Sequence, residues 1–313
     1  MHSRPGGHDE AIDIGAWKQR RLRDDELLWV DMTDPSESDI QSVVAALALP
    51  DATGQLLDDD AEAPLTAVRA GAVEVVVRAP GVELDDEPRA LRILVGDDWV
   101  ITSHRAPIGF LEERRERIQD DREVGRLSPV QFLIAVLNWH VDAYLQAAEQ
   151  LEREVEALDD AALRTERNLL RRLVRMRRRI AQIRRMLAPH REVFAELAGP
   201  SVLPDLAAGD REQLNAMVAR LERAADAIAN AREMLIGTFD VHMTRTAQRT
   251  NDIVRVLTWA SVVLLPAGVI AGIMGMNFQV GFFEDPTMFW VVLAAMVSIA
   301  IGTLLAARLR GWL

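Results

Sequence analysis

Two long stretches near the end of the chain contain no ionisable side chain and are mostly apolar. The first is Val256–Met276 and the second is Thr287–Ala307. A helix of this length rises about 31 Å, which matches the roughly 30 Å hydrocarbon core of a bilayer. No charge opposes insertion of either segment. The pattern therefore predicts two transmembrane helices rather than two buried helices of a soluble core.

Basic residues flank these two stretches on the sides away from the loop 277–286 that connects them. The flanking arginines are Arg245, Arg249, Arg255, Arg308 and Arg310. The loop itself carries Glu284 and Asp285 and no basic residue. The positive-inside rule then predicts an inner (plasma) membrane protein with both ends in the cytoplasm and the loop outside. The polar N-terminus agrees, because it has no apolar core of the kind that a secretory signal needs.

Short strand-like and helix-like runs alternate in the first 125 residues. The strand-like runs are Val73–Arg78, Leu91–Val95 and Trp99–Ser103, and an apolar run begins with Leu28–Met32. The segment Thr33–Ser36 contains Asp and Pro before polar residues, which is a turn and helix-start signal. We predict a cytoplasmic α/β domain over residues 1–125.

A helical pattern dominates from Ser128 onward. We predict helices over Ser128–Leu158 and Ala161–Ala198, and a third that begins near Asp210 as N-cap. No helix breaker follows until Pro266. The third helix is therefore predicted to run unbroken from a stalk over residues 126–250 into a transmembrane domain over 251–313. The whole chain is predicted to be an α+β membrane protein.

The charge of the chain argues against nucleic acid as a partner. The net charge is −12, which repels phosphates. One predicted helix is nevertheless rich in arginine: Arg171, Arg172, Arg175, Arg177, Arg178, Arg179, Arg184 and Arg185. Acidic residues at positions 149–160 of the preceding helix can pair with them, and we favour this interpretation over a nucleic-acid or anionic-lipid surface.

Catalytic and metal-site patterns are absent from the sequence. There is no cysteine, and the six histidines, at positions 2, 8, 104, 140, 190 and 242, have no partner at three or four residues. No nucleophile–base pair and no phosphate-binding glycine loop occurs. We predict that the protein is not an enzyme and needs no cofactor.

Several short segments around the first predicted span form a motif set. They are Thr250–Thr258, Leu265–Pro266, Ile270–Ile273 and Gly275–Phe278, with weaker matches in Trp29–Pro35, Trp99–Arg105 and Arg308–Leu313. Together they resemble the CorA family of magnesium and cobalt channels. A lone Gly-Met-Asn tripeptide carries no information, but its place at the outer end of the penultimate span makes this resemblance specific.

The resemblance implies a homopentamer in the membrane, with the first span of each subunit lining a central pore. It also implies that the pore carries Mg²⁺, as well as Co²⁺ and Ni²⁺, and closes when cytoplasmic Mg²⁺ binds. The family's filter matches Gly275, Met276 and Asn277. The residues that match its pore face are Asn251, Val254, Leu257, Ser261, Leu265, Gly268 and Gly272.

The chemistry of these residues agrees with the resemblance. The spacing of the seven pore positions averages 3.5 residues, which is one face of a helix packed around an axis. A ring of Asn277 carbonyls can hydrogen-bond the water shell of Mg²⁺, which loses water reluctantly. Rings of Val254, Leu257 and Leu265 can close a pore by dewetting. Gly275 is expected to allow a sharp turn that brings the Asn close to the axis.

The sequence departs from the family pattern after the tripeptide. Gln279 stands where CorA chains commonly carry Glu, and carboxylates appear only at Glu284 and Asp285. The preferred ion therefore stays open, and a proton-coupled Zn²⁺ transporter of the ZntB type is an alternative that Met276 disfavours. A membrane-anchored scaffold without transport is the alternative of another class. The acidic runs 58–60 and 85–87 are interpreted as solvated loops.

Overall fold

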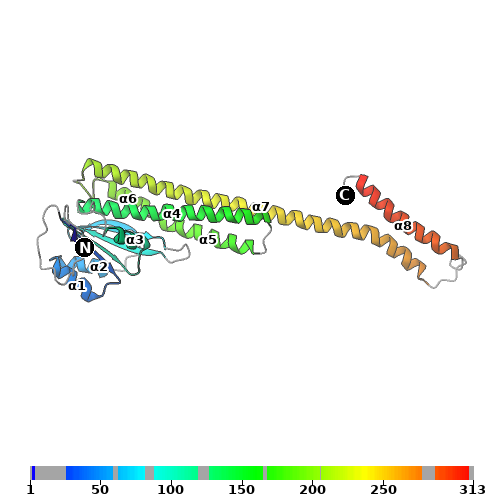
Figure 1. The fold of residues 1–313 in the computed structure, drawn as a ribbon, viewed down its shortest axis with the longest axis horizontal. Coiled ribbons are helices and arrows are strands. Elements are labelled where there is room, and N and C mark those ends of the chain that lie inside the picture. Colours follow the sequence, from blue (N-terminus) through cyan, green and yellow to red (C-terminus); the bar gives the residue numbers. More distant parts are fainter. Residues whose placement is uncertain are drawn as a thin grey trace. The chain divides into compact units, whose positions relative to one another are not determined.

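The computed structural model describes residues 2–3, 26–58, 63–81, 88–118, 127–164, 168–204, 206–276 and 286–309 (Figure 1). The chain divides into two compact units, residues 1–239 and 240–313. This division falls within the segment predicted as a stalk, and the predicted domain limits at residues 125 and 250 stay predictions.

The first unit contains one mixed β-sheet. Its described strands are β1 (His2–Ser3), β2 (Leu27–Thr33), β3 (Leu65–Arg69), β4 (Ala72–Ala79), β5 (Arg89–Val95) and β6 (Trp99–His104). Their order across the sheet is β1-β2-β6-β5-β4-β3. Among the described strand pairs, only β2 and β6 are parallel. The three strands expected from the sequence are confirmed and the apolar run Leu28–Met32 is a strand, whereas β1 and β3 were not predicted.

Side chains alternate between the two faces of this sheet, as the period of two requires. Val75, Val77 and Ile93 belong to the main core, which continues into the helical layer. Leu94 and Ile101 point to the other face and pack with residues of α1 (Glu37–Ala46) and α2 (Asp51–Asp58). The predicted helix start is confirmed, because Ser36 caps α1 in a capping box with Asp39.

The helical layer consists of α3 (Gly109–Ile118), α4 (Pro129–Arg164), α5 (Leu169–Leu187), α6 (His190–Ala198) and the first part of α7 (Ala208–Met274). The expected helix over Ala161–Ala198 is wrong. Proline has no N–H with which to continue a helix, and α5 stops before Pro189, which becomes the N-cap of α6.

Helix α7 is a single 67-residue helix with Pro266 inside it, as the sequence predicted. It begins two residues before Asp210. That carboxylate accepts a hydrogen bond from the Gln131 side chain of α4 at 3.1 Å, so its expected role as N-cap is replaced by a helix–helix contact. Eight buried residues, from Leu214 to Thr238, form the stripe that faces the core of the first unit.

The second unit contains the rest of α7 and α8 (Pro286–Leu309), which folds back along the end of α7 (Figure 1). Both helices are long and apolar enough to cross a membrane, with mean hydropathies of 2.1 and 2.3 in their most apolar windows. Neither window is buried within the chain. This agrees with the two predicted spans.

Candidate functional site

The seven residues matched to a pore face lie on one helix, in the part of α7 that belongs to the second unit. At about 100° per residue they fall within an arc of roughly 120°. All seven are exposed in the single chain, including Val254, Leu257 and Leu265 at 54%, 65% and 67%. The structure therefore brings them together on one uncovered face.

The opposite face of this part of α7 is partly covered. Its half-buried residues are Trp259, Val263, Pro266, Ala267, Ile270 and Met274. Helix α8 has a matching stripe, whose covered residues are Met288, Val292, Met296, Ala300, Thr303 and Ala307. At about 100° per residue, the half-buried stripe of α7 is centred roughly opposite the seven exposed residues. The chain thus uses one side of α7 for its own packing and leaves the other side open.

The uncovered face is apolar or small along most of its length. The Ser261 hydroxyl donates to the Leu257 carbonyl at 2.9 Å, so its proton is used within the helix. A Cβ atom added at Gly268 or Gly272 would meet nothing within 4 Å. No neighbour within the described chain therefore requires glycine at these two positions.

Helix α7 ends at the residues that match the filter. The Gly275 N–H donates to the Ala271 carbonyl at 2.9 Å, and the Met276 N–H donates to the Ile273 carbonyl at 3.3 Å. The chain turns at Gly275 and bends at Met276, and the φ of Gly275 is not in the left-handed region. A Cβ there would lie 3.3 Å from the Ala271 oxygen, which is a tight contact. Asn277, Glu284 and Asp285 lie outside the described residues.

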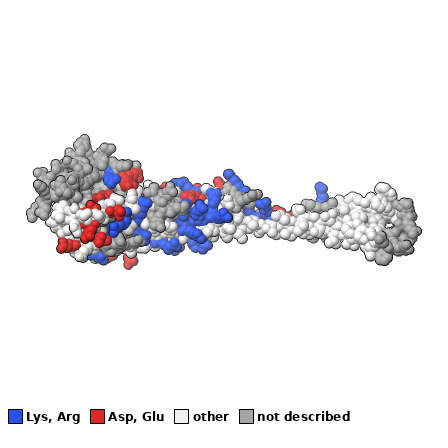
Figure 2. Space-filling view, turned by 90° about the horizontal axis from the view of Figure 1, so that it is seen from below, with Lys and Arg blue, Asp and Glu red and all other residues white. Residues whose placement is uncertain are grey.

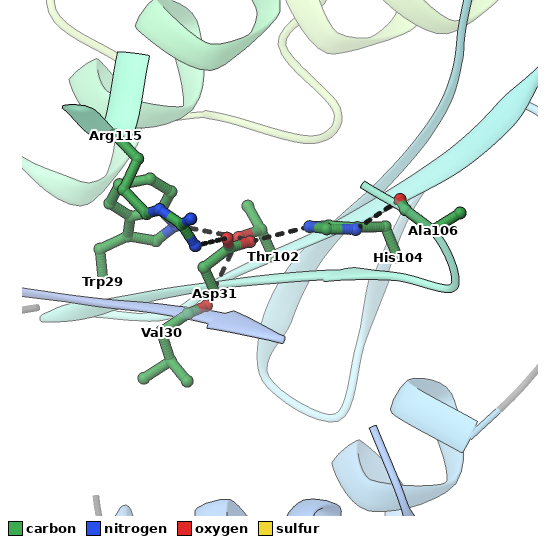
Figure 3. Close-up of polar contacts among 7 residues, drawn as sticks. All are labelled: Trp29, Val30, Asp31, Thr102, His104, Ala106 and Arg115. Atoms are coloured by element: carbon green, nitrogen blue, oxygen red, sulfur yellow. Dashed lines mark hydrogen bonds and ion pairs between the residues drawn. The ribbon is translucent and has the colours of Figure 1, made fainter. Parts of the chain in front are cut away.

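A buried polar network that the sequence did not predict lies where the parallel strands β2 and β6 end (Figure 3). Asp31 accepts hydrogen bonds from the Thr102 hydroxyl at 2.6 Å and from His104 Nε2 at 3.2 Å. Trp29 Nε1 donates to Thr102 Oγ1 at 2.9 Å, and Arg115 of α3 approaches the other carboxylate oxygen at 3.9 Å. The network joins two strands and a helix.

Contacts on both sides of the ring fix the position of His104 in this network. Its Nδ1 lies 2.8 Å from the Ala106 carbonyl, which can only accept, so this nitrogen carries a proton. Nε2 on the other side of the ring faces the Asp31 carboxylate at 3.2 Å. Burial raises the pKa of Asp31, but the hydrogen bonds from His104 and Thr102 outweigh it and hold this pKa below its usual value. Asp31 is therefore stabilised as a carboxylate between Thr102 and His104.

Two further histidines, isolated in the sequence, meet in the core of the first unit. The rings of His140 on α4 and His190 on α6 have centroids 4.7 Å apart. His190 Nε2 accepts from the Arg78 N–H at 2.9 Å, while His140 Nε2 and the Tyr144 hydroxyl donate to the Arg78 carbonyl at 3.0 and 2.7 Å. These side chains hold the end of β4 against two helices.

Burial keeps both of these histidines neutral. Burial lowers the pKa of His140 well below its ordinary value, and the neighbouring His190 lowers it further. Burial also lowers the pKa of His190, to about 4. Burial also raises the pKa of Tyr144. Among the described residues, no group of three or more His, Asp or Glu side chains is arranged to hold a metal ion. The histidines are therefore structural.

Comparisons with known proteins agree with this architecture. A family model described as "CorA-like Mg2+ transporter protein" matches residues 24–308. The cobalt/magnesium transport protein CorA of Methanocaldococcus jannaschii is 25% identical over 301 residues, which is 93% of each chain. The protein of the same name from Thermotoga maritima is 27% identical over 207 residues, or 64% of this chain and 57% of that one.

Solved structures share the fold. The complete CorA structure from Methanocaldococcus jannaschii has a TM-score of 0.79 at 23% identity, with 91% of each chain covered. The full-length CmaX protein has a TM-score of 0.73 at 20% identity, with 92% of this chain and 90% of that chain covered. The cytoplasmic domain of ZntB from Vibrio parahaemolyticus has a TM-score of 0.59 at 14% identity, with 70% of this chain and 88% of that chain covered.

Proposed function

Because the chain belongs to the family of CorA-like Mg²⁺ transporters, we propose that it carries divalent cations across a membrane, with Mg²⁺ as the preferred ion and Co²⁺ and Ni²⁺ as further substrates. The two apolar helices anchor it in the inner membrane. The arginines that flank both helices favour an orientation with both termini in the cytoplasm. Transport is driven by the membrane potential, which attracts cations inward.

The uncovered face of α7 is the observation that carries this proposal. An apolar helix packed on one side only by α8 leaves a second side for copies of the same chain. Five copies of that face, arranged around an axis, form a pore lined from Asn251 at the cytoplasmic end to Gly272 near the outer end. Gly268 and Gly272 fit this arrangement, because small residues allow close approach of neighbouring helices.

The filter of the proposed pore is Gly275, Met276 and Asn277. Five side-chain carbonyls of Asn277 bind the first water shell of Mg²⁺, so the ion enters without losing water. Rings of Val254, Leu257 and Leu265 form the closed state by excluding water from the narrow part of the pore. Cytoplasmic Mg²⁺ favours this closed state.

Cation flux into proteoliposomes under an inward-negative potential tests the proposal. Wild-type protein is expected to take up Mg²⁺, Co²⁺ and Ni²⁺, and Asn277→Ala is expected to lose most of this uptake. Gln279→Ala removes a similar amide from the same loop and serves as the matched control. Equal Mg²⁺ uptake by Asn277→Ala and wild type would show that Asn277 is not the filter. Zn²⁺ uptake that follows a pH gradient and ignores voltage would support the ZntB-type function, and no flux of any ion would support a scaffold.

The hydrophobic gate has its own matched pair of variants. Leu257→Asn adds a polar group to the uncovered face, so water enters the closed pore more readily and flux at high cytoplasmic Mg²⁺ increases. Val256→Asn is the control, because Val256 is equally exposed at 69% but points about 100° away around the helix. Similar flux changes in the two variants would contradict the assignment of the pore face.

A further inference from the structure

Helix α5 has a charge opposite to that of the rest of the chain. Leu169–Leu187 contains eight arginines and no acidic residue, so its formal charge is +8. The whole chain carries −12, and the remainder therefore carries −12 − 8 = −20. Figure 2 shows basic side chains gathered along the helical part of the first unit.

Most of these arginines are not neutralised within the chain. Arg179 pairs with Glu154 of α4 at 2.8 Å, which confirms the expected pairing at one position, and Arg172 also has a partner. The remaining six form no ion pair in the part of the chain that the structure describes, and all are exposed. They are Arg171, Arg175, Arg177, Arg178, Arg184 and Arg185. Their charges are left for a partner outside the subunit.

A complementary acidic row lies on α4. Glu152, Glu156 and Asp160 are spaced at four residues, which places them along one side of the helix, and none forms an ion pair among the described residues. Glu154 points to α5 and Glu156 lies about 160° away from it around the helix. The row therefore lies on the flank of α4 that faces away from α5.

An exposed apolar side chain accompanies each charged surface. Val174 is 44% exposed among the arginines of α5, and Leu163 is 48% exposed one turn beyond the acidic row. Protein interfaces combine apolar contacts with Arg, whose planar group binds carboxylates in a bidentate manner. A polyanion such as nucleic acid or an anionic bilayer is repelled by the −20 of the remainder, whereas a second copy of the chain offers the matching acidic row.

We propose that the arginines of α5 dock on the acidic row Glu152, Glu156 and Asp160 of a neighbouring copy. The two surfaces lie on different sides of the subunit, so the contact is heterologous and continues from copy to copy until a ring closes. This inference rests on the proposed oligomeric pore and adds a cytoplasmic contact to it. It explains why neither surface is neutralised within its own chain.

Cross-linking of the full-length protein in detergent tests the contact. The chain has no cysteine, so Val174→Cys with Leu163→Cys gives one thiol on each surface. A flexible bis-maleimide is expected to produce a ladder of multimers, because each subunit is joined on both sides. Reversing the acidic row with Glu152→Arg, Glu156→Arg and Asp160→Arg should lower the multimer yield about tenfold, as expected for three exposed pairs of about 0.5 kcal/mol each. Adding Arg171→Glu, Arg175→Glu and Arg178→Glu to these changes should restore it.

Three outcomes would overturn the inference. One is a ladder that the acidic reversal leaves unchanged, and another is a loss that the charge swap does not restore. The third is binding of the wild type to vesicles of anionic lipid that the arginine reversal abolishes without any effect on the ladder. The mass of the complex and its Mg²⁺ flux separate these results from a failure of the pore. An intact, conducting oligomer with no rescue refutes only the contact, whereas a monomeric wild type refutes both.

Discussion

The two halves of helix α7 follow opposite rules of side-chain placement. In the first half an apolar stripe from Leu214 to Thr238 is buried, while charged residues occupy the other sides. From Asp240 to Met276 no described side chain of the helix is fully buried, and the charges stop at Arg255. Both halves belong to one continuous α-helix.

The difference indicates which medium surrounds each half of the helix. An amphipathic stripe is the pattern of a helix with protein on one side and water on the other. A helix that is apolar all round and exposed within its own chain needs lipid or other copies as neighbours. The pattern changes within one unbroken helix, so the environment changes along it and the secondary structure does not.

The largest expected effect comes from adding charge to the second half. Val262→Asp with Leu264→Asp adds roughly 5–7 kcal/mol to membrane insertion, because each central carboxylate opposes it by about 2.5–3.5 kcal/mol. The doubly substituted protein should leave the carbonate-resistant membrane fraction. Met234→Asp with Ile236→Asp changes two exposed residues of the first half and should leave that fraction unaltered. Equal membrane association of both variants would mean that the halves do not differ in solvent.

The same leucine truncation should have different consequences in the two halves. Leu221 is fully buried, and Leu221→Ala should lower the free energy of unfolding of the first unit by about 3 kcal/mol through the cavity that it leaves. Leu264 is 67% exposed, and Leu264→Ala should change this free energy by less than about 0.5 kcal/mol. Thermal unfolding of the protein in detergent measures both. A loss of similar size at Leu264 would indicate packing that the single chain does not show.

A buried polar network around Asp31 also stabilises the first unit. The described apolar faces of the second unit contain no such network. Asp31→Asn replaces the carboxylate that Thr102, His104 and Arg115 contact by a neutral amide, which has one acceptor oxygen instead of two. We expect the free energy of unfolding to fall by about 2–3 kcal/mol. Asp34→Asn is the control, because Asp34 is 73% exposed and its ion pair with Arg105 is 3.8 Å long. Equal unfolding temperatures for the two variants would contradict a structural role for the network.

The smallest expected effect in this series is the loss of folding stability at acidic pH. His140 and His190 have lowered pKa values in the folded state, so the unfolded chain binds more protons below about pH 6.5 and stability falls as the pH falls. For His190, with a pKa of about 4, the loss at pH 5 is about 2 kcal/mol. His190→Gln keeps an acceptor for the Arg78 N–H and should remove its share of the loss. An unfolding temperature with no dependence on pH between 7 and 5 would contradict this.

Local patterns in the sequence predict much of this fold and part of the candidate site. The hydrophobic pattern identifies three of the strands, and the absence of charge identifies the two apolar helices. The parallel pairing of β2 with β6 depends on contacts between segments about 70 residues apart, and so does the meeting of Asp31 with His104. His140 and His190 meet through the packing of α4 and α6, which no spacing in the sequence encodes. Pro189 indicates a helix end in the sequence, and the helix predicted over Ala161–Ala198 did not take it into account.

The open space beside Gly268 and Gly272 has a genetic consequence. No neighbour in the described chain restricts these positions, so a subunit with Gly272→Leu is expected to fold, insert and join an oligomer. A defect then arises only where copies meet. In the proposed homopentamer, an equal mixture of normal and altered chains leaves about 3% of the rings fully normal. Substitutions at these glycines should therefore be dominant in a cell that expresses both chains, whereas substitutions that unfold the first unit should be recessive.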